Sequence, residues 1–144
     1  MKTPLELTPQ QRYDIVKYRI DNAVKTLGEI ETLISLKYYN TAANRMYYAR
    51  YYAACALLIA NKINTKSHDG VRQMFSRHFI KTGVLPMQLS RTYSVLFKQR
   101  TSGDYDDMFD NTVDSVTELY PQAKEFIAAV KAKVDLWLAE NVSE

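Results

Sequence analysis

The chain is poor in the residues that interrupt or cross-link a fold: of its 144 residues one is cysteine, four are glycine and four are proline. The lone thiol, Cys55, excludes an internal disulfide framework and a cysteine-built zinc cluster, and it suits a reducing compartment. No basic leader precedes an apolar run, and no apolar run approaches the roughly 18 residues that a membrane span needs. We therefore expect a cytoplasmic protein that makes no use of a membrane.

Signatures of common enzyme chemistry are missing as well. The sequence has no glycine-rich phosphate loop, no His-Glu-x-x-His zinc pair and no recognisable Ser-His-Asp arrangement. We therefore expect neither a metal nor a cofactor. The net charge of +3 permits contact with nucleic acid without requiring it. A hydrophobic fraction of 47% in a chain of this length predicts one globular domain over residues 1–144, with its core at about 9–140.

Helix signals run along the whole chain, whereas strand signals are almost absent. Thr8 and Pro9 form an N-cap followed by proline at the first helical position. Apolar residues then recur at steps of three and four from Tyr13 to Ile34, which predicts one helix ending near Lys37. Four further helices are expected at about 40–61, 67–83, 86–103 and 113–137. The predicted fold is an all-α, up-down bundle of four or five helices.

The second of these helices is apolar on every side, which predicts a central position. Tyr48, Tyr52 and a series of alanines share one arc, while Tyr47, Tyr51 and Leu58 lie on the opposite one. One arc would pack inside the domain. A second subunit is the natural cover for the other arc, or for the outer face of the last helix, so we expect a homodimer.

Several polar residues are candidates for a site, each with a structural alternative. His68 follows the Ser67 cap and could bind an anion at the helix N-terminus, or be a surface histidine in a capped turn. Arg100, Asp104 and Tyr105 could bind phosphate and relay a proton, although helix-end electrostatics alone explain the arginine and the aspartate. Arg45 and Tyr48 could border the same cleft or satisfy each other in the core.

The ordered set of these motifs resembles the HEPN superfamily (higher eukaryotes and prokaryotes nucleotide-binding). The set comprises Asn44-Arg-x-Tyr-Tyr-Ala, Ala54-x-Ala-Leu-Leu, Ser67-His-x-Gly-Val, Phe79-Ile-Lys-x-Gly and Arg100-x-x-x-Asp-Tyr. It spans roughly residues 10–135 and is most similar to the small stand-alone prokaryotic members. The resemblance implies a helical bundle, usually dimeric, often encoded beside a minimal nucleotidyltransferase in toxin–antitoxin or defence pairs.

Many proteins of that superfamily are metal-independent endoribonucleases, whose motif is an arginine followed four to six residues later by a histidine. Arg100 matches the arginine, but positions 104 to 106 are Asp104, Tyr105 and Asp106. A tyrosine with its ordinary pKa near 10 is a much weaker general base at neutral pH than a half-titrated imidazole. In paired systems a tyrosine near the motif can receive a nucleotide from the partner enzyme, and Tyr105 is the candidate here.

Two hypotheses follow from the resemblance. In the first, the chain is a dimeric RNA- or nucleotide-binding module with a departed, weak or conditional ribonuclease site at Arg100, Asp104 and Tyr105, bordered by Arg45, Tyr48 and His68. In the second, it is a non-catalytic interaction partner of a separately encoded minimal nucleotidyltransferase. The retained arginine, aspartate and tyrosine favour the first, and the absent histidine favours the second.

Overall fold

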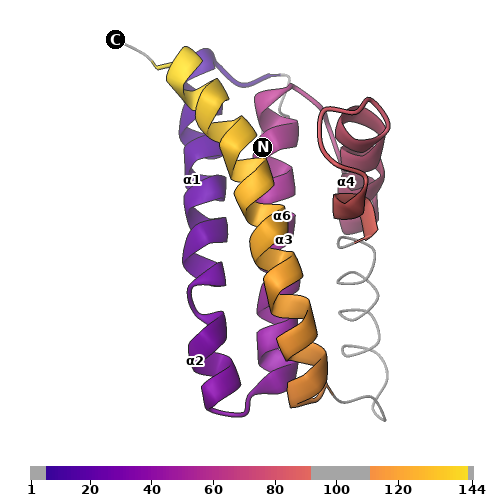
Figure 1. Cartoon of the computed structure of the whole chain (residues 1–144). Helices are drawn as coiled ribbons and strands as arrows, with labels where there is room; N and C mark the ends of the chain where they lie inside the picture. The colour runs from indigo at the N-terminus through magenta and orange to yellow at the C-terminus, as the bar shows by residue number, and fades with distance from the viewer. Residues whose placement is uncertain (1–5, 92–110, 143–144) are drawn as a thin grey trace.

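The regular structure of the protein is helical wherever it is described. The computed structural model describes residues 6–91 and 111–142, and no strand occurs among them. The elements are α1 (Pro9–Leu27), α2 (Ile30–Ser35), α3 (Tyr39–Ala60), α4 (His68–Phe75), the π-helical turn η1 (Ser76–Ile80) and α6 (Val113–Glu140). Figure 1 shows α1, α3 and α6 side by side along the molecule, with α4 on the opposite side of α3 from α1. The predicted all-α class is confirmed.

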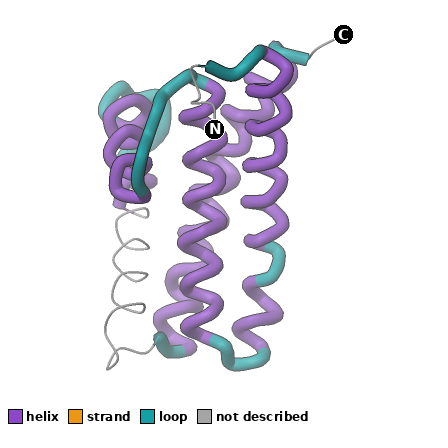
Figure 2. Tube along the Cα trace, turned by 180° about the vertical axis from the view of Figure 1, so that it is seen from behind, coloured by secondary structure: helices purple, strands orange, loops and turns teal. Residues whose placement is uncertain are grey.

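The first predicted helix is divided in two. It begins as expected. The Thr8 side chain accepts a hydrogen bond from the Gln11 amide, the Gln11 side chain accepts one from the Thr8 amide, and Pro9 is the first helical residue. It ends at Leu27, however, because Gly28 and Glu29 form a turn in which the Glu29 amide donates to the Thr26 carbonyl. Figure 2 shows this break as a loop between α1 and α2. The expectation of one unbroken helix was wrong, since an interior glycine costs about 1 kcal/mol and favours a break.

α3 is the central helix, as its composition predicted. It packs against α1, α2, α4 and α6, and its buried residues lie all around it. Tyr47 and Leu58 are 0% and 1% exposed. The arc that was expected to pack against a second subunit is therefore already buried within the chain. The cover is α4, whose Val71 and Phe75 join the same core cluster as Leu58. The argument for a dimer interface on that arc was therefore wrong.

The α4 region folds back on α3 through a cap, a π turn and a glycine. The Ser67 hydroxyl accepts a hydrogen bond from the Gly70 amide at 2.9 Å, which confirms the predicted cap. After Phe75 the backbone hydrogen bonds span five residues instead of four, since the Lys81 amide donates to the Ser76 carbonyl. The π turn ends at Ile80, three residues before the predicted end at Gly83, and Gly83 lies in the following turn with a φ of 80° that suits glycine. The next predicted helix is described only as far as Arg91.

α6 closes the bundle as one continuous helix. Thr112 caps its start in a reciprocal pair with Ser115, and Pro121 lies inside the helix without dividing it. A stripe of fully buried residues faces α3 and α1, namely Val116, Ala123, Phe126, Val130 and Val134. Among the described helices, none is both long enough and apolar enough to span a bilayer.

Candidate functional site

The three residues predicted to form the polar site, Arg100, Asp104 and Tyr105, lie outside the described residues. The first described residue after them, Asn111, is 7% exposed. Its backbone amide and its side-chain Nδ2 donate to Asn40 Oδ1 at 2.7 and 3.1 Å. Asn111 is therefore held at the first turn of α3, directly before the Thr112 cap of α6.

His68 belongs to an aromatic cluster, which we define as Tyr47, Tyr48, Tyr51, Tyr52 and His68. The imidazole stacks on Tyr51 with ring centroids 4.1 Å apart and planes 10° apart, and Tyr48 meets it edge-on. His68 Nδ1 and the Tyr47 hydroxyl are 2.5 Å apart. His68 does follow a capped turn, as expected, but its ring is half-buried against α3 rather than on the surface. The cluster joins the start of α4 to the middle of α3.

Beneath this cluster lies a buried cation that sequence analysis did not single out. Arg50 is 0% exposed, and its guanidinium carbon is 4.8 Å from the Tyr47 ring centroid and 5.7 Å from that of Phe126. Cation–π contacts of this kind are strongest when they are shielded from water. A signal was present in the sequence: Arg50 is a lone charge within an otherwise apolar helical run.

Arg45 and Tyr48 belong to different surroundings. Arg45 Nη2 donates to Thr26 Oγ1 at 3.2 Å, and its Nε lies 3.8 Å from a Glu29 carboxylate oxygen. The arginine side chain is 31% exposed. It therefore ties α3 to the turn between α1 and α2, while Tyr48 packs in the aromatic cluster. The expectation that the two satisfy each other in the core was wrong, because one helical turn of separation did not make their side chains face the same neighbours.

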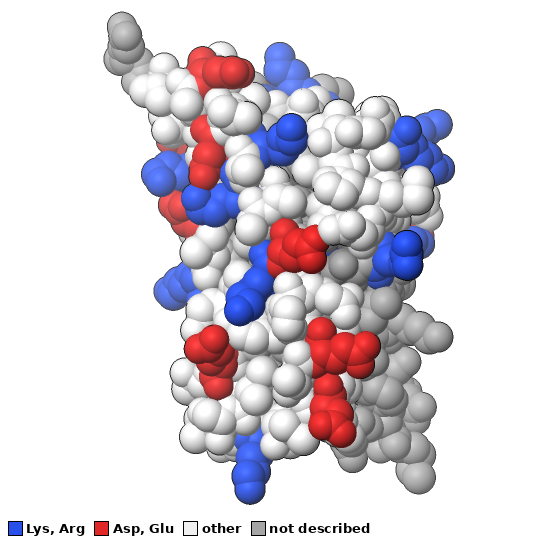
Figure 3. Space-filling model, in the orientation of Figure 1, with Lys and Arg blue, Asp and Glu red and all other residues white. Residues whose placement is uncertain are grey.

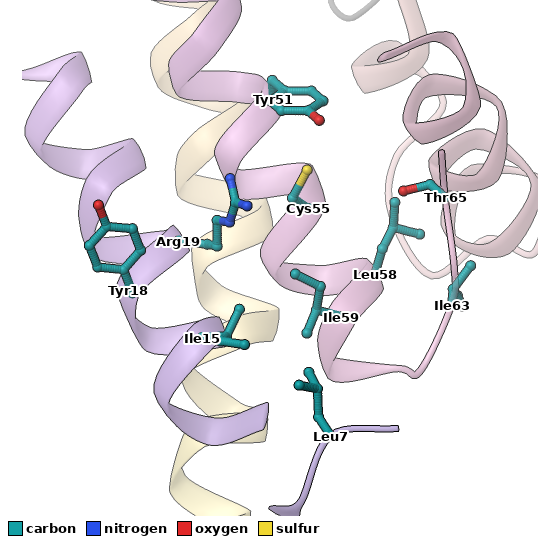
Figure 4. A pocket seen from close by; sticks show the side chains of 10 residues that line it. All are labelled: Leu7, Ile15, Tyr18, Arg19, Tyr51, Cys55, Leu58, Ile59, Ile63 and Thr65. Atoms are coloured by element: carbon teal, nitrogen blue, oxygen red, sulfur yellow. The ribbon is translucent and has the colours of Figure 1, made fainter. Parts of the chain in front are cut away.

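A cavity of about 480 Å³ adjoins the aromatic cluster on the α1 side of α3. Figure 4 shows its lining side chains, which come from the start of the chain, α1, α3 and the segment before α4: Leu7, Ile15, Tyr18, Arg19, Tyr51, Cys55, Leu58, Ile59, Ile63 and Thr65. Burial raises the pKa of the Cys55 thiol to about 11 and also raises the pKa of the neighbouring Tyr51 hydroxyl. Both groups are therefore neutral near pH 7. No sequence pattern indicated this cavity, because it forms between elements far apart along the chain.

A basic surface occupies the outer side of α4 and η1, and we define it as Arg72, Arg77 and Lys81. These residues, with Gln73, Met74 and Ser76, line a hollow of about 470 Å³. Figure 3 shows blue side chains on the visible surface over this part of the molecule. Arg72 is partly compensated, since its Nη2 lies 2.7 Å from an Asp69 oxygen.

The charge pattern around this surface was visible in the sequence but overlooked. Residues 66–91 contain five Lys and Arg residues and one Asp, a sum of +4, whereas the whole chain carries +3. The positive excess of the protein is thus concentrated in one segment, which a whole-chain charge conceals. Among the described residues, no group of three His, Cys, Asp or Glu could hold a metal ion.

Comparison with known proteins connects this architecture to a family. The HEPN domain profile matches residues 16–133. A UPF0332 protein of Thermotoga maritima is 29% identical over 87% of this chain and 95% of its own length. A protein of Methanocaldococcus jannaschii named as a putative toxin is 31% identical over 81% of each chain. The crystal structure of an archaeal HEPN homologue superposes with a TM-score of 0.68 at 21% identity, covering 83% of this chain and 97% of that one.

Proposed function

The chain belongs to the HEPN domain family, and from that premise we propose that it is a toxin-type module that binds RNA. In this proposal it acts in the cytoplasm as a homodimer. The relatives named as putative toxins support the toxin role. The dimer interface would lie away from the α3 arc that contains Tyr47 and Leu58, because α4 covers that arc.

The observation that carries the proposal is the basic surface of α4 and η1. A phosphate backbone is bound mainly by Lys and Arg, and neutralising its charges releases condensed counterions. Arg77 and Lys81 lie on one hollow, and none of the described residues that line it is a carboxylate. The π turn at Ser76–Ile80 sets the direction in which these two side chains leave the helix, and π turns recur at functional positions.

RNA cleavage is the finer part of the proposal, and it rests on Arg100 with Tyr105. Metal-independent cleavage requires a base to take the proton of the ribose 2′-hydroxyl and a cation to stabilise the charge that builds on phosphorus. Arg100 supplies the cation. Because tyrosine is a poor base near pH 7, we propose that binding is retained and that cleavage is weak or conditional.

The test measures binding and cleavage separately. Labelled single-stranded RNA is titrated with wild type, with the double variant Arg77→Gln/Lys81→Gln and with Arg100→Ala. The double variant should bind about tenfold more weakly, since it loses two phosphate contacts. Lys25→Gln removes one charge from α1, on the far side of α3, and should bind as wild type does. Equal affinity of all variants, with no cleavage by any of them, would reject the proposal.

The second candidate function is a non-catalytic partner of a minimal nucleotidyltransferase. The specific observation in its favour is that no histidine occurs at positions 104 to 106. In this role Tyr105 would accept a nucleotide from the partner enzyme. Affinity purification from the native host that recovers no nucleotidyltransferase would count against it.

A further inference from the structure

The cavity between α1 and α3 combines apolar walls with one charged group. Ile15, Leu58, Ile59 and Ile63 provide hydrocarbon on several sides. Arg19 is the only charged side chain among the described residues that line it, and no Asp or Glu is among them. Its volume of about 480 Å³ lies within the range of small-molecule sites, which are mostly apolar with a few polar groups that fix orientation.

Arg19 is positioned to meet an anion inside this cavity. In the part of the chain that the structure describes, no ion pair or hydrogen bond involves its guanidinium. Figure 4 shows the side chain extending from α1 toward α3, toward the Cys55 thiol and the Tyr51 ring. A guanidinium keeps its proton at every physiological pH. The cavity wall therefore carries a permanent positive charge that no neighbour among the described residues neutralises.

The remaining polar groups of the cavity are neutral. The raised pKa values of Tyr51 and Cys55 keep a hydroxyl and a thiol protonated near pH 7, so neither competes for Arg19 as an anion. The Tyr51 hydroxyl shares a hydrogen bond with the Cys55 thiol, and it can donate instead to a carboxylate oxygen.

We propose that this cavity binds a small amphiphilic monoanion, a monocarboxylate with a hydrocarbon body. The carboxylate meets Arg19 and the Tyr51 hydroxyl, and the hydrocarbon lies against Ile15, Ile59 and Ile63. A neutral ligand with the same hydrocarbon body would leave the positive charge of Arg19 without a counter-charge, and a cationic ligand would be repelled by it. The Tyr51 ring forms part of the wall and stacks on His68, so an occupied cavity also supports the start of α4.

The first experiment uses decanoate as the probe, titrated into the full chain below its micelle concentration and followed by calorimetry. Decanol and decylamine have the same hydrocarbon body without the negative charge. Decanoate should bind saturably at one site, decanol at least about tenfold more weakly, and decylamine not at all. Arg19→Gln should weaken decanoate binding by about tenfold or more and leave decanol binding unchanged, because only the charge-assisted bond is lost. Lys25→Gln, which removes a charge from the same helix outside the cavity, should bind decanoate as wild type does.

A second variant tests the location. Ile59→Trp places a larger side chain in the cavity and should abolish binding of decanoate and decanol alike, while the helical circular dichroism signal is kept. Arg19 is half-buried, so the Arg19→Gln chain should fold even if the tryptophan is not tolerated. Absence of saturable decanoate binding, equal affinity of wild type and Arg19→Gln for decanoate, or undiminished binding by a folded Ile59→Trp chain would each overturn the proposal.

Discussion

The Tyr47 hydroxyl is the polar group that joins α3 to the start of α4. Its ring is 0% exposed, and the hydroxyl lies 2.5 Å from His68 Nδ1. Tyr47→Phe keeps the ring and its stacking but removes this bond from a shielded position. We expect the free energy of unfolding to fall by about 1–2 kcal/mol, the usual cost of leaving a partly buried partner without its hydrogen bond.

Urea denaturation followed by circular dichroism measures this change. Tyr38→Phe removes the same hydroxyl from a side chain that is 58% exposed, and it should change stability by less than about 0.5 kcal/mol. If the two variants lose equal amounts of stability, the Tyr47–His68 bond contributes nothing.

Individual residues were predictable from sequence where their role is local. Thr8 and Ser67 were recognised as caps because a cap depends only on the next three residues. The contact between Tyr47 and His68 was not, since it depends on how α4 folds back across 21 positions. The partners of Arg45 were missed for a related reason: the sequence does not show that Thr26 and Glu29 lie beside it.

α6 contains a feature that should weaken it. Pro121 lies nine residues into the helix, where it has no amide to donate and its ring crowds the preceding turn. The residue is exposed, so replacing it removes no core packing. Pro121→Ala should restore one backbone hydrogen bond and raise the free energy of unfolding by about 1–2 kcal/mol, less than the full helix penalty of proline because the unfolded chain also gains freedom.

The same denaturation measurement gives this result, with Gln122→Ala as the matched substitution. Glutamine and alanine have similar helix propensities, so that variant should stay close to wild type. A Pro121→Ala chain no more stable than wild type would mean that the helix has already adapted to the missing donor.

The helices were predicted well where amphipathic periodicity or composition was continuous. The bounds expected for the central helix, 40–61, agree with α3 at Tyr39–Ala60. The break at Gly28 was missed because apolar residues continue at steps of three and four residues on both sides of the glycine. The π turn at Ser76–Ile80 was missed because one inserted residue leaves no mark in a three-four pattern.

The bundle and its family were accessible from the sequence, whereas the cavity between α1 and α3 was not. Periodicity fixes helices, and the ordered motifs indicated the HEPN family that the profile match shows. The Arg19 cavity is a product of tertiary packing, because its lining residues come from elements far apart along the chain. The basic surface lies within residues 72–81, so its charges could have been read from the sequence. The predicted trio of Arg100, Asp104 and Tyr105 stays a prediction, since it lies outside the described residues.

The salt dependence of RNA binding tests the basic surface as a property of the folded molecule. Each phosphate contact with single-stranded RNA contributes about 0.7 to the slope of log affinity against log salt concentration, because one contact releases condensed counterions. Arg77→Gln/Lys81→Gln should therefore flatten the slope by about 1.4, and Lys25→Gln should leave it unchanged. Affinities measured by fluorescence anisotropy over a series of potassium chloride concentrations give the slopes. A weaker affinity with an unaltered slope would mean that the two cations support the fold of η1 and do not contact phosphate, since a structural defect lowers the amount of competent protein at every salt concentration alike.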